Sequence, residues 1–156
     1  MLVVAVGNAP ENFDRLLSFV DDFVGRQKLD CFLQTGYSTF KPRHSTKEPF
    51  VSHSDLSAIF GEASSIIIHG GSGLFEMVAL ASKFPIICPR QVSLGEHTDP
   101  SQPAFVKFLM ERDLCIEITC KETDSRLLEI IELASKRTLH FNQQKFAWSV
   151  NRRLGL

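Results

Sequence analysis

The sequence predicts an α/β fold, with a Rossmann-like parallel sheet flanked by helices. Short continuous apolar runs recur along its 156 residues, and the clearest are Leu2–Val6, Ser65–Ile68 and Ile86–Cys88. Such runs are typical of strands buried on both faces of a sheet. Segments with apolar residues at helical spacing lie between the runs, as in Phe13–Val24. Strands that alternate with helices pair in parallel, which gives this fold class.

The first half of the chain follows this alternation. Leu2–Val6 is expected to be a strand, and the helix after it should stop at Gly25, a good helix terminator. Cys31–Gln34 is expected to be the second strand. Residues 37–49 are polar and contain two prolines, so they read as a loop before a short strand at Phe50–Val51.

The second half repeats the pattern. Further strands are expected at Ser65–Ile68, Ile86–Cys88 and Cys115–Ile118. Helices are expected at about Ser54–Phe60, Leu74–Ser82, from near Pro103 to Leu109, Ser125–Lys136 and Asn142–Arg152. Ser54 is a suitable residue to begin its helix. No repeat or low-complexity tract interrupts the chain, so residues 1–156 are predicted to form one domain, closed by helices at about 125–152.

Composition narrows the function. The net charge of −1 gives no reason to expect a nucleic-acid partner. The four cysteines form no C-x-x-C pair, so we interpret them as reduced, buried residues. The first residues lack a secretory leader, and no apolar run reaches the roughly 20 residues that span a bilayer. We therefore expect a cytoplasmic protein that would meet a membrane only through a partner.

Two loops carry the candidate chemistry. The strand Ser65–Ile68 leads into His69-Gly70-Gly71-Ser72-Gly73 and then into a helix. Glycines at a helix N-terminus let backbone N–H groups approach a phosphate, which the helix dipole favours. The next strand leads into a polar loop, Gly95–Gln102. Together these loops predict a nucleotide-sugar site.

Several segments occur in one characteristic order over residues 1 to about 120. They are Val6-Gly7, Phe13-Asp14-Arg15-Leu16, Gln34-Thr35-Gly36-Tyr37-Ser38, His69-Gly70-Gly71-Ser72-Gly73, Pro89-Arg90 and Gly95-Glu96-His97-x-Asp99-x-x-Gln102. This order resembles the C-terminal, donor-binding half of the family 28 glycosyltransferases. The chain looks most like the short half-enzymes of that family: bacterial exopolysaccharide glycosyltransferase subunits and the eukaryotic dolichol-linked GlcNAc transferase catalytic subunit. MurG is a full-length relative.

The resemblance implies the C-terminal half of a GT-B fold and an inverting transfer from a UDP-sugar to a lipid-linked acceptor. N-acetylglucosamine, glucose, galactose and glucuronate remain open as the sugar. The acceptor half would be a separate, membrane-associated subunit, and the isolated chain could form a homodimer. No cofactor or metal is expected, and the sequence has no Asp-x-Asp motif for a divalent ion.

The resemblance also implies site residues. His69 and His97 are candidates for the general base. The implied donor-binding residues are Gly7, Asn8, Gln34, Thr35, Gly36, Gly70, Gly71, Ser72, Gly73, Glu76, Arg90, Glu96, Asp99 and Gln102. The chain departs from the family pattern at Asn8, Leu74, Glu76 and Pro100-Ser101.

Other interpretations stay open at this stage. His69 could be structural, Arg90 could pair with a surface acid, and Asp99 or Gln102 could cap a helix. Ser72 after a strand resembles a hydrolase nucleophile, although Leu74 replaces the closing glycine of that motif. Gly71-x-Gly73 resembles part of a dinucleotide-binding turn, with Glu76 in place of its third glycine. A UDP-sugar-binding regulatory module without turnover is a further alternative. The C-terminal aromatic and basic residues suit either packing or a partner interface.

Overall fold

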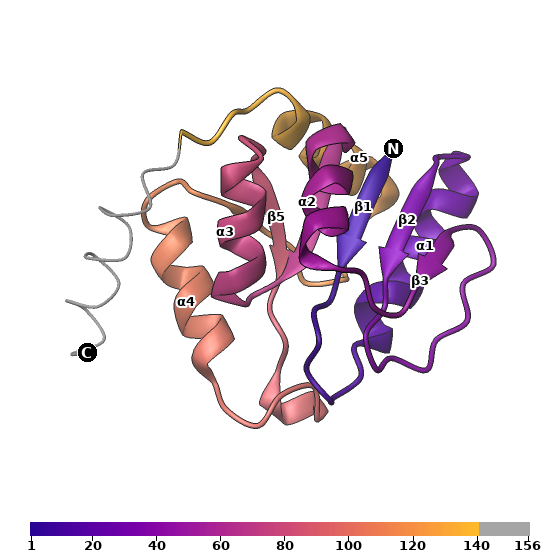
Figure 1. The fold of residues 1–156 in the computed structure, drawn as a ribbon, viewed down its shortest axis with the longest axis horizontal. Coiled ribbons are helices and arrows are strands. Elements are labelled where there is room, and N and C mark those ends of the chain that lie inside the picture. Colours follow the sequence, from indigo (N-terminus) through magenta and orange to yellow (C-terminus); the bar gives the residue numbers. More distant parts are fainter. Residues whose placement is uncertain (141–156) are drawn as a thin grey trace.

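The computed structural model describes residues 1–140, which form a six-stranded, all-parallel sheet flanked by helices. The strands are β1 (Leu2–Ala5), β2 (Cys31–Gln34), β3 (Thr46–Glu48), β4 (Ser65–His69), β5 (Pro85–Cys88) and β6 (Ile116–Glu117). Their order across the sheet is β3-β2-β1-β4-β5-β6 (Figure 1). The predicted fold class is confirmed.

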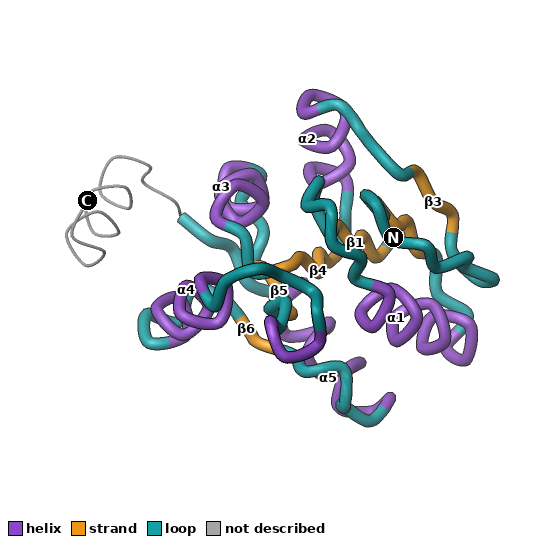
Figure 2. Tube along the Cα trace, turned by 90° about the horizontal axis from the view of Figure 1, so that it is seen from below, coloured by secondary structure: helices purple, strands orange, loops and turns teal. Residues whose placement is uncertain are grey.

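Helices cover both faces of the sheet. They are α1 (Asp14–Gln27), α2 (His53–Glu62), α3 (Ser72–Leu80), α4 (Ser101–Met110) and α5 (Asp124–Ser135), with a 3-10 turn η1 at Val92–Leu94. Figure 2 shows α2 and α3 on one face and α1 and α5 on the other. Helix α4 packs beside the edge strand β6. No helix among residues 1–140 is long and apolar enough to cross a bilayer.

The central strands are the most buried part of the molecule. All residues of β1 and β5 are buried, and Ile66, Ile67 and Ile68 of β4 have no exposed surface. The helices contribute the remaining core through residues such as Phe23 of α1 and Phe75 of α3. Continuous apolar runs made these strands predictable, because both faces of each strand must be covered.

The structure corrects several expected elements. Helix α3 spans Ser72–Leu80 rather than Leu74–Ser82, and β6 spans Ile116–Glu117 rather than Cys115–Ile118. The edge strand β3 lies at Thr46–Glu48, inside the segment predicted as a loop, whereas Phe50–Val51 is not a strand. All three β3 residues are exposed, so the strand has no apolar signature. Helix α1 continues past Gly25 to Gln27, and Lys28 ends it in a left-handed conformation. Helix α4 begins at Ser101 rather than near Pro103. The helix predicted at Asn142–Arg152 lies outside the described residues.

The strand order creates a switch point between β1 and β4. From β1 the chain proceeds outward through β2 and β3, and from β4 it proceeds the other way through β5 and β6. The loops after β1 and β4 therefore leave the same edge of the sheet in opposite directions. In open parallel sheets, ligands bind in the crevice that this divergence leaves at the carboxyl ends of the strands.

Candidate functional site

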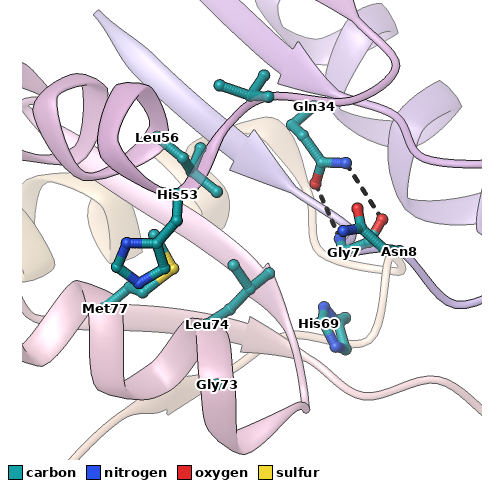
Figure 3. Close-up of a pocket in the computed structure, with 10 residues that line it drawn as sticks. Gly7, Asn8, Gln34, His53, Leu56, His69, Gly73, Leu74 and Met77 are labelled. Carbon is teal, nitrogen blue, oxygen red and sulfur yellow. Dashed lines mark hydrogen bonds between the residues drawn. The ribbon is translucent and has the colours of Figure 1, made fainter.

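A pocket of about 310 Å³ opens at this switch point (Figure 3). Two loops contribute to it: the segment after β1 and the β4–α3 connection. A third wall comes from Val51, just before α2, and from the first turn of that helix. The lining residues are Gly7, Asn8, Gln34, Val51, His53, Leu56, His69, Gly73, Leu74 and Met77. Five of these were predicted as site residues: Gly7, Asn8, Gln34, His69 and Gly73.

Gln34 holds the loop after β1 in place. Its Oε1 accepts a hydrogen bond from the Gly7 N–H at 2.9 Å, and its Nε2 donates to the carbonyls of Gly7 at 3.1 Å and Pro49 at 2.8 Å. The side chain is only 2% exposed. Since both amide hydrogens have protein acceptors, Gln34 shapes the pocket floor and joins it to the segment that leads into α2.

Glycine is needed where this loop meets β4. Gly7 has φ +73°, and a Cβ at this position would lie 2.6 Å from Cε1 of His69. Gly36, with φ +53°, is equally constrained, because a Cβ there would lie 2.4 Å from the Gly7 carbonyl oxygen. Gly36 and Thr35 donate backbone hydrogen bonds to Pro49 and Glu48. These two predicted residues support the pocket from behind and do not line it.

The N-terminus of α3 forms another wall, and no side chain caps it. Gly71 is the N-cap residue, and Ser72 and Gly73 are exposed at the first two helical positions. A Cβ at Gly71 would lie 2.2 Å from Nε2 of His69, whereas a Cβ at Gly73 would meet nothing within 4 Å. The first N–H groups of a helix have no intrahelical acceptor and attract anions. Gly73 leaves the space in front of them open.

His69 ends β4 beneath the pocket, with its ring against the two glycines. Burial, followed by the charge of Arg90, lowers the pKa of His69 from 6.5 to about 4. The imidazole is therefore neutral near neutral pH. A general base works best when its pKa lies near the working pH. His69 is poorly matched to the catalytic role suggested for it and well placed as a neutral wall of the pocket.

His97 lies in the loop before α4, outside the pocket lining. Its Nδ1 accepts hydrogen bonds from the backbone N–H groups of Thr98 at 2.9 Å and Asp99 at 3.2 Å. In the neutral ring this leaves the proton on Nε2. The free edge of His97 is thus a donor, which suits a hydrogen bond to a ligand better than proton abstraction.

Gln102 and Asp99 organise the start of α4. Oε1 of Gln102 accepts from the N–H groups of Gly70 and Arg90, each at 3.1 Å, so one buried amide joins the ends of β4 and β5. Asp99 accepts from the Ser101 N–H at 2.8 Å, and hydrogen bonds from Ser101 lower its pKa. The helix-cap alternative is wrong, because Pro100 is the N-cap residue of α4 and no side chain caps this helix. The Asp99 carboxylate remains exposed to solvent.

Arg90 is directed into the protein. Its guanidinium is 1% exposed and donates to the carbonyls of Val6, Glu11, Asn12 and Glu96 at 2.9 to 3.1 Å. It also lies over the ring of Phe13, 4.7 Å from the centroid. Backbone carbonyls occupy both terminal nitrogens of Arg90, which favours a structural role over a direct contact with a diphosphate. Arg90 joins the segment after β1 to the loop after β5 at the carboxyl edge of the sheet.

Glu96 is a structural anchor as well. Its carboxylate forms a two-pronged ion pair with Arg15 of α1, at 2.8 and 2.9 Å, and accepts from the Gln91 N–H at 3.0 Å. The hydrogen bond to Glu96 raises the pKa of Arg15. Arg15 also donates to the carbonyls of Pro89 and Thr119. Arg15, which was not among the predicted site residues, thus joins α1 to the loops after β5 and β6.

Two remaining predicted residues lie outside the pocket lining. Ser72 is exposed, and within residues 1–140 no hydrogen bond joins its hydroxyl to a histidine, as a hydrolase nucleophile would need. Glu76 is half-buried on α3. In the described part of the chain, no group of three or more His, Cys, Asp and Glu side chains is placed to hold a metal ion.

Sequence reasoning missed half of the pocket lining. The residues it missed are Val51, His53, Leu56, Leu74 and Met77. The helix expected from Ser54 begins at His53, because Ser52 caps α2 through the Asp55 N–H at 3.1 Å. Ser52, two residues before the predicted start at Ser54, is the capping signal that would have placed His53 at the helix start. Leu56, Leu74 and Met77 belong to two helices, α2 and α3, and no local pattern in the sequence shows that these helices lie side by side.

Solved glycosyltransferase structures share this architecture. The glycotransferase of kitacinnamycin matches with a TM-score of 0.61 and 15% identity, covering 87% of this chain and 35% of that chain. SnogD from Streptomyces nogalater matches at 0.57 and 17%, covering 86% and 36%. MurG from Acinetobacter baumannii matches at 0.57 and 18%, covering 85% and 42%.

These similarities define a fold class. The described chain is an α/β domain that resembles one half of a GT-B fold, and it spans between about a third and two fifths of the length of those proteins. At such low identity the likeness concerns the fold alone. No protein-family model and no curated protein sequence matches the chain.

Proposed function

We propose that this chain is the donor-binding half of a UDP-sugar-dependent glycosyltransferase. The observation that carries the proposal is the pocket at the β1–β4 switch point, with the uncapped N-terminus of α3 on one wall. The likeness to halves of glycosyltransferase structures and the order of motifs in the sequence support the same assignment.

The pocket offers two kinds of contact that a nucleotide diphosphate needs. The α3 N-terminus, where Gly73 lines the pocket and no side chain caps the helix, suits the diphosphate, since the positive end of the helix dipole lies there. Val51 and Leu56, on the α2 side, and Met77, further along α3, provide apolar surface for a planar base. Asp99, exposed at the start of α4, is our proposed contact for a hydroxyl of the donor sugar. Gln102 contributes indirectly by holding Gly70.

The general base is proposed to come from a second subunit. His69 has a pKa of about 4, and Nδ1 of His97 is occupied by two backbone donors. Neither is well prepared to deprotonate an acceptor hydroxyl. The partner would bind the lipid-linked acceptor at a membrane, with this half on the cytoplasmic side. Because neither histidine is well prepared as a base, one alternative is also favoured: a UDP-sugar-binding module without turnover.

Calorimetric titration tests the donor site. We expect the purified chain to bind UDP, and one of its N-acetylglucosamine, glucose, galactose or glucuronate conjugates, without added metal. Gly73→Val should weaken binding at least tenfold, because the new side chain enters the open space before the α3 amides. Gly61→Val is the matched control: Gly61 is also helical, its Cβ would also meet nothing within 4 Å, and it lies outside the pocket.

Two results would contradict the proposal. Equal weakening by both valine variants would place binding elsewhere, and absence of binding to every nucleotide would remove the donor site. Transfer to a lipid-linked acceptor by the purified chain alone, at enzymatic rates, would refute the need for a partner. Binding that persists without transfer when an acceptor-binding subunit is present would favour the regulatory module.

A further inference from the structure

Two cysteine thiols lie in contact at the carboxyl edge of the sheet, outside the pocket. Cys88 ends β5 and Cys120 follows β6, and their Sγ atoms are 3.5 Å apart although 32 positions separate them in sequence. The β5–β6 ladder brings them together: Ile87 pairs with Glu117, and the Ile118 N–H donates to the Ile87 carbonyl at 2.9 Å. The thiol contact is therefore fixed by the sheet.

The two thiols differ in their access to solvent. Cys88 has no exposed surface, whereas Cys120 is half-buried. The other two cysteines, Cys31 and Cys115, are buried and contact no second sulfur. A small oxidant can reach the pair only through Cys120, and Cys88 then lies behind it at contact distance.

A fixed positive charge lies beside the pair. Nη1 of Arg15 is 3.5 Å from Sγ of Cys88 and 3.0 Å from the Thr119 carbonyl oxygen, and Glu96 holds the other edge of the guanidinium. The hydrogen bond with Cys88 and the charge of Arg15 lower the pKa of the Cys120 thiol. The same sulfur contact and burial raise the pKa of Cys88. Because Cys120 is also the sulfur that solvent can reach, it is the thiol that ionises and attacks the oxidant.

We propose that Cys88 and Cys120 form a reversible intramolecular disulfide when the chain meets a hydroperoxide. The Cys120 thiolate attacks hydrogen peroxide, which breaks the O–O bond, releases hydroxide and leaves a sulfenic acid on Cys120. Cys88 then attacks that sulfur, an S–S bond forms, and water leaves with the proton of the Cys88 thiol. In total, two thiols and one peroxide give one disulfide and two waters.

The bond would join the end of β5 to the segment after β6. The sulfurs need to approach by about 1.5 Å to reach a disulfide length of about 2.0 Å. The crosslink closes a loop that contains η1 and α4. Because a crosslink restricts the unfolded chain, the oxidised protein should unfold at a higher urea concentration than the reduced one. This inference does not depend on the proposed glycosyltransferase function.

Peroxide treatment of the purified full chain tests the proposal. The intact mass should fall by two hydrogens, and non-reducing peptide mapping should find Cys88 joined to Cys120, with both changes reversed by dithiothreitol. The mapping uses the natural sequence, so it needs no variant that must fold. Cys88→Ser should instead accumulate a sulfenic acid on Cys120 that dimedone traps. Cys115→Ala should leave the crosslink unchanged.

A crosslink that includes Cys31 or Cys115, one that joins two chains, or one that forms only in urea would overturn the proposal. Recovery of Cys88 and Cys120 as free thiols, at peroxide doses that oxidise a small model thiol fully, would overturn it as well.

Discussion

At the scale of single residues, His69 illustrates how a side chain can end a strand at a ligand pocket without becoming an acid or a base. Its ring fills the space that a Cβ on Gly7 or Gly71 would otherwise occupy. This packing removes water from the imidazole, and burial then opposes its protonation. The residue contributes shape to the pocket and a dependence on pH to the whole fold.

His69 should make the protein acid-labile. Its pKa is about 4 in the folded state and 6.5 in the unfolded reference, so between these values the unfolded chain binds the additional proton. Stability is therefore lost as the pH falls below about 6.5, by about 2 kcal/mol between about pH 7 and about pH 5. His69→Asn should remove most of this loss in urea unfolding at the two pH values. Exposed His53→Asn is the control and should keep the natural dependence; equal slopes for all three proteins would contradict the argument.

At the scale of elements, the carboxyl edge of the sheet is held by polar side chains from α1 and the β5–α4 loop. Arg15 and Glu96 are 23% and 6% exposed, and they bridge elements that are 81 residues apart. The exposed pair Arg126–Glu129, within α5, has the same charges in a solvated setting. Burial and additional backbone acceptors distinguish the two pairs energetically.

Breaking the buried pair should therefore cost much more than breaking the exposed one. We expect Glu96→Gln to lower the free energy of unfolding by about 2–4 kcal/mol, because the Arg15 charge stays half-buried without its partner. Glu129→Gln should have little effect. Urea unfolding measures both, and a double-mutant cycle with Arg15→Met isolates the coupling. A coupling no larger than that of the Arg126–Glu129 pair would refute this role for the Arg15–Glu96 pair.

The same elements show what the sequence could and could not predict. Buried strands such as β4 were predictable, because both faces must be apolar. The exposed edge strand β3 was not, since Thr46, Lys47 and Glu48 have no apolar face to pack. The motif order located the glycines of the pocket. It did not separate Arg90 and Glu96, whose polar groups satisfy loop backbone, from residues that face a ligand, because that distinction depends on orientation in three dimensions.

At the scale of the whole molecule, the pocket joins the two halves of the sheet. Gly7 and Asn8 follow β1, the innermost strand of one half, and Gly73 and Leu74 follow β4, the innermost strand of the other. Val51, His53 and Leu56 form the remaining wall. They follow the edge strand β3, from which the chain runs back to the pocket and into α2. A ligand here would contact three segments that lie far apart in the sequence.

Hydrogen exchange should reveal this convergence. Saturation with UDP should slow amide exchange together in residues 7–9, 51–56 and 69–77, because a ligand that bridges the switch point restrains all three segments. Exchange should not change in β6, at the edge of the sheet, or in α5, which covers the face opposite α2 and α3. Gly73→Val should abolish the protection at the same UDP concentration, whereas Gly61→Val should retain it. Protection confined to one of the three segments would mean that the nucleotide binds beside the switch point and not across it, and the donor-site assignment would then be wrong.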